Sequence, residues 1–314
     1  MKFSLLTFFS MLVASSTSLL TNKEYHNRFL EFMVQYNKDY TGNDEYQLRY
    51  NIFKGNVDVI EEHNKGGHSW LMDVNEFADM PWHEFRNTHI SYTPNNTPGL
   101  SFTGGTTNYN DIPEEWDWTE KGAVTPVKNQ GSCGSCWSFS TTGAVEGAWF
   151  VETGNLVSLS EQQLVDCSGS FGNKGCNGGL MNNGFKYIAN NGICTEYSYP
   201  YTAKDDSCST CTTSPVTVSS FNNVLPRNEE SLRQAVFKQP VSVALEADQS
   251  FWQFYSKGVA DSKCGTNLDH GVLVVGYGTL DGKDYWKVKN SWGTSWGDEG
   301  YILLARNVKS TQGQ

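Results

Sequence analysis

The residues whose types are best suited to a chemical reaction lie in one short segment, residues 130–137, which read QGSCGSCW. The residues from Ser135 to about Glu152 have the spacing of apolar side chains that predicts a helix. Cys136 would then lie at the helix N-terminus, where partial positive charge lowers a thiol pKa and favours the nucleophilic thiolate. The segment therefore predicts Cys136 as a nucleophile, with Cys133 beside it as a structural half-cystine.

Two other functions of the Cys-x-x-Cys unit compete with this interpretation. A redox pair would need a thioredoxin-like βαβ setting, which the flanking pattern does not provide. A zinc site would need a second such unit or a histidine pair, and Cys208-x-x-Cys211 is the only candidate. A nucleophile fits best, and we expect no metal and no organic cofactor.

A nucleophilic thiol also needs a base, and the positions of the histidines restrict the choice. Only His270 follows the domain boundary that we predict near Asp111, because the other five histidines precede it: His26, His63, His68, His83 and His89. Asn290 can accept a hydrogen bond from the second ring nitrogen of His270 and fix its tautomer. The backbone N–H of Cys136 and the side-chain amide of Gln130 are candidates to stabilise an oxyanion.

Composition and charge limit the function and the location of the chain. With 314 residues and a net charge of -11, the sequence is long enough for a catalytic unit plus an accessory segment, and binding to nucleic acid is not expected. The apolar run at residues 3–13, followed by small residues, predicts a signal peptide over residues 1–18 and is too short to span a membrane. Eight cysteines favour disulfides in an oxidising compartment. We expect a monomeric protein that is lysosomal or secreted and that is not stably inserted in a membrane.

The pattern of elements divides the rest of the chain in two. Helical spacing over residues 23–40 and 45–64 predicts a helical accessory segment, residues 19–110, which ends in a polar linker at 92–110 carrying the sequon at Asn95. The remainder, residues 111–314, has helices first, with a capping box predicted at Ser160 and Gln163. Strands are predicted at 272–277, 285–289 and 301–305. This order indicates an α+β enzyme with two lobes.

The motifs together resemble those of papain-like cysteine proteases of the cathepsin L type, from about residue 25 to residue 306. The matching blocks are residues 130–137, GCNGG at 175–179, LDHG at 268–271 and NSWG at 290–293. A long inhibitory prosegment is matched by Glu45, Arg49, Phe53, Asn56, Ile60 and Asn64. In a second prosegment motif, residues 73–79, Asp73 stands where the family has glycine.

The resemblance implies a papain-like fold with a helical lobe, a β-barrel-like lobe and an N-terminal helical inhibitory prosegment. It implies a cysteine endopeptidase that works through a thioester and is activated by acid, with its own propeptide, protein and peptide substrates, and cystatin-like inhibitors as partners. The alternative is an inactive homologue that inhibits proteases or binds peptides. Against it stands the intact set Cys136, His270, Asn290 and Gln130, which binding alone does not require.

The resemblance also assigns residues to substrate binding and disulfides. Gly178 and Gly179 would pair with the substrate backbone, and an apolar pocket would favour Leu, Phe or Val at the second position before the scissile bond. Its residues, with Asp269 as a further contact, would be Leu180, Met181, Ala244 and Leu268. The implied disulfides are Cys133–Cys176 and Cys167–Cys208, and Cys194 could pair with Cys211. The family partner of Cys264 would follow Gln314, so we expect a short C-terminus.

Overall fold

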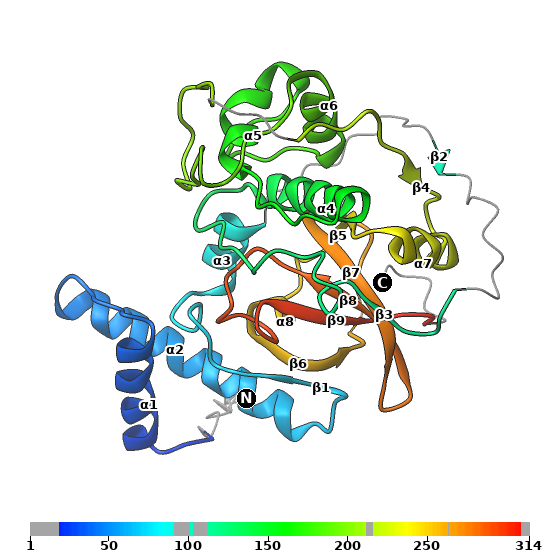
Figure 1. Ribbon diagram of the computed structural model, residues 1–314. Helices are drawn as coiled ribbons and strands as arrows, with labels where there is room; N and C mark the ends of the chain where they lie inside the picture. The colour runs from blue at the N-terminus through cyan, green and yellow to red at the C-terminus, as the bar shows by residue number, and fades with distance from the viewer. Residues whose placement is uncertain (1–18, 91–100, 103–111, 212–215, 263, 309–314) are drawn as a thin grey trace, which may run out of the picture.

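The computed structural model describes residues 19–90, 101–102, 112–211, 216–262 and 264–308 (Figure 1). The predicted signal peptide, the sequon at Asn95 and the predicted boundary at residues 110 and 111 lie outside the described residues.

Two helices open the described chain, as the aromatic spacing predicts. α1 (Asn22–Gln35) begins with a capping box in which Thr21 and Glu24 bond reciprocally, and α2 (Gly42–Lys65) follows it. α1 is shorter than the predicted run to residue 40, because the chain turns at Asn37, where φ is +49°. Phe29 and Phe53 pack against each other between the two helices, with ring centroids 5.2 Å apart.

Three further elements of the N-terminal part are absent from the sequence-based prediction. They are β1 (Trp70–Met72), α3 (Trp82–His89) and β2 (Ser101–Phe102). β1 pairs antiparallel with β6 (Tyr255–Ala260), and β2 pairs in parallel with β4 (Asn223–Val224). The predicted linker at 92–110 therefore contains a short strand at Ser101–Phe102.

The helical lobe consists of α4 (Cys136–Thr153), α5 (Glu161–Cys167), a 3-10 turn (Ser168–Phe171) and α6 (Met181–Asn191). Half of the predicted capping box at the start of α5 is wrong. The Ser160 hydroxyl accepts from the backbone N–H of Gln163 (3.0 Å). The Gln163 side chain instead accepts from Cys194 N (2.7 Å) and donates to the Tyr187 hydroxyl (3.0 Å), so it ties α5 to its neighbours.

The sheet lobe consists of β3 (Trp116–Asp117), α7 (Glu229–Lys238), β5 (Val241–Leu245), α8 (Phe251–Phe254), β6 (Tyr255–Ala260), β7 (His270–Leu280), β8 (Lys283–Lys289) and β9 (Tyr301–Ala305). The strands predicted at 272–277, 285–289 and 301–305 fall within β7, β8 and β9. Over the described residues the strand order is β1-β6-β9-β8-β7-β3, with β5 also paired to β7. In Figure 1 the helical lobe lies above this sheet, and α4 crosses next to β5 and β7.

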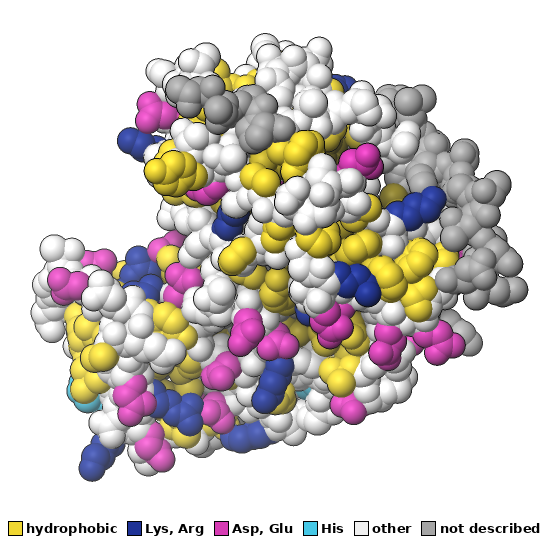
Figure 2. All heavy atoms as spheres, viewed as in Figure 1, with side chains coloured by type: hydrophobic (Ala, Val, Ile, Leu, Met, Phe, Trp, Pro, Cys, Tyr) yellow, Lys and Arg dark blue, Asp and Glu magenta, His cyan; other side chains and the backbone are white. Residues whose placement is uncertain are grey.

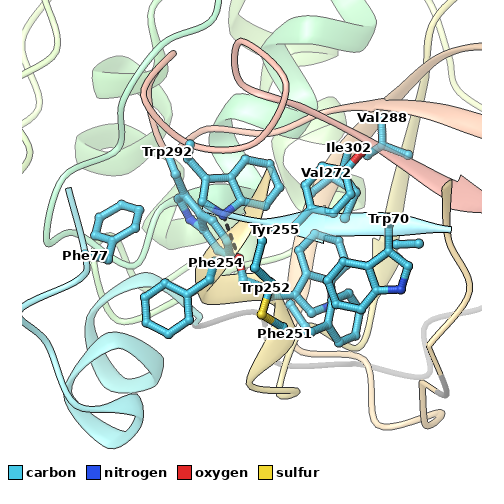
Figure 3. Packing of buried hydrophobic residues seen from close by; sticks show 14 of the residues in the cluster. Trp70, Phe77, Phe251, Trp252, Phe254, Tyr255, Val272, Val288, Trp292 and Ile302 are labelled. Atoms are coloured by element: carbon cyan, nitrogen blue, oxygen red, sulfur yellow. Dashed lines mark hydrogen bonds between the residues drawn. The ribbon is translucent and has the colours of Figure 1, made fainter. Parts of the chain in front are cut away.

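The N-terminal segment and the sheet lobe share one hydrophobic core. Figure 3 shows Phe77 and Trp70 of the N-terminal segment on either side of Phe251, Trp252 and Tyr255. The Trp70 ring lies 5.3 Å from that of Phe251. Burial of such large aromatic surfaces from both parts provides most of the driving force for their association. The predicted α+β architecture of two lobes plus a helical N-terminal segment is confirmed.

The face drawn in Figure 2 carries charged side chains of both signs. On the face drawn in Figure 2, acidic and basic side chains are interspersed over the N-terminal helices and the adjoining sheet lobe. Among the described residues, no helix has the length and apolar character needed to cross a bilayer.

Candidate active site

Cys136 is the first residue of α4 and is fully buried in this form of the chain. Its Sγ accepts a hydrogen bond from the backbone N–H of Gly271 (3.4 Å), so it lies where the two lobes meet. A disulfide between Cys133 and Cys176 and a bond from Gly134 N to the Cys176 carbonyl (3.0 Å) fix the turn before it. The thiol is thus held rigidly at a helix N-terminus, whose partial positive charge favours the thiolate.

His270 is the first residue of β7 and directly precedes the glycine that contacts the thiol. Its Nε2 donates to Oδ1 of Asn290 (2.8 Å), and the Trp292 ring stacks on the imidazole with centroids 4.7 Å apart. Nδ1 of His270 has no hydrogen-bond partner among the described residues. Burial lowers the pKa of His270 to about 4, although the bond to Asn290 opposes this shift. In this covered state the imidazole is neutral.

Gln130, six residues before Cys136, is also fully buried. Its Oε1 accepts from the Ser291 hydroxyl (2.7 Å), which orients the amide so that its Nε2 is a donor toward the cleft. Nε2 donates to the Cys133 carbonyl (3.0 Å) and to the carbonyl of His89 (3.3 Å). The structure thus brings together Cys136, His270 and Asn290, with Gln130 as a donor to a carbonyl of the N-terminal segment.

Sequence reasoning missed His89, which it set aside because it precedes the domain boundary. Its ring packs against those of Phe85 (4.9 Å) and Trp292 (6.1 Å), and only 4% of the residue is exposed. Burial lowers the pKa of His89 to about 4, while its contact with the Phe85 carbonyl opposes this shift. A signal was present in the sequence, since Phe85 and His89 are four residues apart and share one face of a helix.

Most of the predicted substrate-binding residues lie around the same cleft. Gly179 packs so closely on Trp137 that a Cβ would lie 2.6 Å from the indole ring, so only glycine fits there. Gly178 precedes it with a φ of +101°. Met181, at the start of α6, approaches Gly271, whose strand partner is Ala244.

The remaining predicted substrate contacts differ in exposure. Leu180 is buried next to Met181, whereas Leu268 remains 36% exposed. Asp269 has a structural contact, because its Oδ1 accepts from the backbone N–H of Ala247 (2.7 Å). Its Oδ2 has no hydrogen-bond partner among the described residues.

The N-terminal segment is fastened along the sheet lobe by polar contacts. Asn75 Nδ2 donates to the Gln253 carbonyl (2.7 Å), and Gln253 Nε2 donates to the carbonyls of Phe77 (3.0 Å) and Met80 (2.9 Å). Together with pairing of β1 to β6, these bonds hold α3 across the site. The segment therefore blocks the cleft in the way expected of an inhibitory prosegment.

Three residues of α2 that match the family's prosegment motif form polar contacts within the N-terminal segment. Arg49 forms a bidentate ion pair with Glu84 of α3 (2.8 and 3.1 Å), and Asn56 donates to the carbonyls of Ala78 (2.8 Å) and Met80 (2.9 Å). Asn64 exchanges two bonds with the backbone of Met72 (2.9 and 3.0 Å). Asp73 is not among the residues with positive φ, so a side chain is accommodated where the family has glycine.

One cysteine of the first Cys-x-x-Cys unit and both cysteines of the second form disulfides with cysteines outside their own unit. Besides Cys133–Cys176, the structure has the implied Cys167–Cys208 and also Cys194–Cys211. Each cysteine of the second unit is therefore paired elsewhere, which leaves neither thiol for a zinc ion. Within the described residues, no cluster of three or more histidine, cysteine or acidic side chains could hold a metal.

Comparison with known families agrees with this geometry. The model for "Papain family cysteine protease" matches residues 112–313, and that for "Cathepsin propeptide inhibitor domain (I29)" matches residues 29–85.

Among characterised proteins, the chain is 43% identical over 291 residues to the senescence-specific cysteine protease SAG39 of Oryza sativa, covering 91% of this chain and 86% of that protein. It is 45% identical over 297 residues to the thiol protease aleurain of Arabidopsis thaliana, covering 92% and 82%.

Solved proenzyme structures are similar over nearly the whole chain. A recombinant stem bromelain precursor superposes with a TM-score of 0.86 at 39% identity, covering 92% of this chain and 95% of that one. Digestive procathepsin L 3 of Tenebrio molitor gives 0.83 at 41% identity, covering 90% and 94%.

Proposed function

The chain belongs to the papain family of cysteine proteases and carries a cathepsin-type propeptide, and we propose that it hydrolyses peptide bonds with Cys136 as nucleophile and His270 as its proton carrier. The observation that carries this assignment is the junction of the two lobes. There the Cys136 thiol at the start of α4 contacts Gly271, and the adjacent His270 is oriented by Asn290 at 2.8 Å.

In the proposed reaction the thiol proton passes to Nδ1 of His270, and the thiolate attacks the substrate carbonyl carbon. The carbonyl oxygen becomes an oxyanion, for which Gln130 Nε2 and the backbone N–H of Cys136 are the proposed donors. In support of this role, Gln130 Nε2 already donates to a propeptide carbonyl, that of His89, in the covered enzyme.

The intermediate collapses when the C–N bond breaks and the imidazolium protonates the leaving amine, which leaves a thioester on Cys136. Water, deprotonated by the now neutral His270, then attacks the thioester and releases the carboxylic acid and the thiol. Asn290 keeps Nδ1 directed to the reacting atoms through both steps, because its Oδ1 holds Nε2–H and so fixes the tautomer.

We propose that the enzyme prefers an apolar residue at the second position before the scissile bond. The proposed pocket contains Met181 and Ala244, which belong to one apolar cluster in the cleft wall. Gly179 packs on Trp137 of the same cluster, and its backbone is the proposed partner of an extended substrate strand. Leu, Phe or Val fit such a pocket, since their burial removes apolar surface from water.

We propose that acid releases the propeptide from the cleft. His89 is neutral where it is buried against Trp292, and near it lie Glu84, Lys38 and the active-site His270. Once the propeptide is released, His89 is exposed and has the ordinary histidine pKa. As the pH falls below that value, the released propeptide binds a proton that the docked propeptide cannot bind, so docking weakens. We also propose that the chain enters the secretory pathway and is then delivered to a lysosome-like compartment or secreted. A lysosome-like compartment would supply the acid for propeptide release.

The test is hydrolysis of fluorogenic peptides with Phe, Leu, Val, Asp or Lys before a fixed Arg, after acid treatment of the purified zymogen. We expect turnover with Phe, Leu and Val, little with Asp, and none from the Cys136→Ala chain. Equal turnover by Cys136→Ala would exclude the assigned nucleophile. A processed, folded wild-type protein without activity would favour an inactive peptide-binding homologue.

A further inference from the structure

The loop that follows β5 is fixed beside the proposed active site. β5 ends with Leu245 opposite His270. Glu246 then accepts from the backbone N–H groups of Gly265 (3.1 Å) and Asn267 (2.6 Å), and Asp269 accepts from Ala247 (2.7 Å). Because these bonds hold the loop on both sides, the next residue projects from a rigid support rather than a mobile one.

That next residue, Asp248, holds a basic side chain of the propeptide. Its Oδ2 lies 2.7 Å from Nη2 of Arg86, with side-chain exposures of 24% for the aspartate and 50% for the arginine. Among the described residues it is the only ion pair that joins the propeptide to the catalytic part. A guanidinium is therefore already seated at this point of the cleft while the enzyme is covered.

The position of Arg86 along the cleft follows from the rest of α3. Three residues further on, the carbonyl of His89 accepts from Gln130 (3.3 Å), so α3 ends at the proposed oxyanion site. Phe85 packs on Trp292, with ring centroids 5.0 Å apart, and Trp292 stacks on His270, whereas Gly179 packs on Trp137. If Gly179 pairs with the residues before the scissile bond, Asp248 lies beside the residues after it.

The electrostatic setting favours a cation here. Glu246 and Asp269 lie near Asp248, and burial, followed by the nearby charge of Asp248 and then that of Glu246, raises the pKa of Asp269 to about 6. Departure of the propeptide removes the guanidinium of Arg86 and leaves these carboxylates without it. A basic substrate side chain would restore the lost charge balance.

We propose that Asp248 is a specificity-determining residue that selects arginine or lysine on the carboxyl-terminal side of the scissile bond. This inference rests on the proposed proteolytic function and extends it to the half of the cleft that receives the leaving amine. Arg86 of the propeptide then occupies the place of a substrate side chain, although the propeptide chain runs as a helix there.

The experiment uses internally quenched peptides that share one sequence before the scissile bond. Arg, Ala or Glu is placed in turn at the first, second and third positions after it. Values of kcat/KM are measured for acid-processed wild type, Asp248→Asn and Asp248→Arg, each normalised by active-site titration. The matched control is Asp206→Asn, an exposed aspartate on the helical lobe that pairs with Lys204.

At one of the three positions, the wild-type preference for Arg over Glu should fall about two- to five-fold in Asp248→Asn, which is the range of an exposed ion pair. It should reverse in Asp248→Arg and stay unchanged in Asp206→Asn. A wild type without such a preference, or one that Asp248→Asn retains in full at all positions, overturns the inference. Failure of the wild type to cleave a peptidyl-coumarin substrate would instead contradict the proposed function.

Discussion

At the scale of single residues, one hydrogen bond orients the proposed catalytic base. Oδ1 of Asn290 accepts from Nε2 of His270 and also from the backbone N–H of Ser291 (2.8 Å), which fixes the asparagine. Trp292, fully buried, stacks on the imidazole and keeps water from this bond. Because a buried bond of this kind determines which ring nitrogen carries the proton, its loss should affect turnover more than folding.

Asn290→Ala should therefore reduce kcat/KM by about 100-fold, the cost of a misplaced catalytic group. The protein should still fold, and its KM should change little, because Asn290 is not a proposed substrate contact. Steady-state kinetics on processed enzyme, with thermal unfolding as the check on folding, measure both quantities. A kcat/KM within threefold of wild type would contradict the role assigned to Asn290.

His89→Met should make propeptide release less dependent on acid. The pKa of buried His89 is about 4, below its ordinary value of 6.5. The neutral histidine therefore favours docking fully above pH 6.5, and this contribution is lost progressively as pH falls toward 4. Methionine cannot bind the proton, so the ratio of processing rates at about pH 4.5 and about pH 6.5 should fall roughly tenfold.

The control for His89 lies on the same helix. His83 is exposed on α3, so His83→Met should leave the ratio of processing rates unchanged. Rates are followed by gel densitometry over the pH series, with the two pH values compared within each variant so that a general change in docking strength cancels. An unchanged ratio in His89→Met would show that other groups sense the acid.

At the scale of elements, α3 connects the propeptide scaffold to the cleft. It has eight residues, too few to be stable alone, and it depends on tertiary contacts at both ends. Arg49 of α2 provides one of them, through its bidentate pair with Glu84 and a bond to the Asp79 carbonyl (3.1 Å). The scaffold thus determines where His89 and Arg86 lie.

Arg49→Met should lower the free energy of unfolding of the propeptide scaffold by about 1–3 kcal/mol, because charged hydrogen bonds to Glu84 and Asp79 are lost. It should also raise the processing rate at neutral pH. Urea unfolding in a Cys136→Ala background, where no cleavage occurs, measures the first effect. Arg28→Met, which removes an exposed pair with Glu61, should cost less than about 1 kcal/mol, and equal losses would contradict the argument.

Helices and strands with a clear periodic spacing of apolar side chains could be predicted from the sequence. Those that form only because they pair with a strand distant in sequence could not. α1 and α2 follow from aromatic spacing, and the position of Cys136 follows from the helix after it. β1 and β2 have three and two residues, so neither has a periodic pattern, and each exists because β6 or β4 pairs with it. His89 was set aside because it precedes the predicted boundary, and its contact with Trp292, which is distant in sequence, could not be predicted from local spacing.

At the scale of the whole molecule, a buried ion network ties the two lobes together beneath the cleft. Lys128 Nζ contacts Glu161 of α5 (2.7 Å) and Glu146 of α4 (3.3 Å). Glu146 also accepts from the Thr125 hydroxyl (2.7 Å), and Lys289 of β8 donates to the same hydroxyl (3.0 Å). The network thus runs from the helical lobe to the strand that ends next to Asn290.

Lys128→Met should destabilise the protein by about 3–5 kcal/mol, because two carboxylates remain buried without their cation. The surface variant Lys204→Met removes an exposed pair with Asp206 and should cost less than about 1 kcal/mol. Thermal and urea unfolding of both variants in the Cys136→Ala background give the comparison. A loss for Lys128→Met no larger than that for Lys204→Met would show that the network does not stabilise the lobes.

The most direct test of the account is labelling of the chain by an epoxide reagent that alkylates active-site thiols, before and after acid processing, read by intact and peptide mass spectrometry. We predict no label on the zymogen, one label per molecule after processing, and its location on Cys136, with labelling abolished in Cys136→Ala. Equal labelling of the zymogen would contradict the proposed block by the propeptide. Label on another cysteine, or none after processing, would contradict Cys136 as the nucleophile.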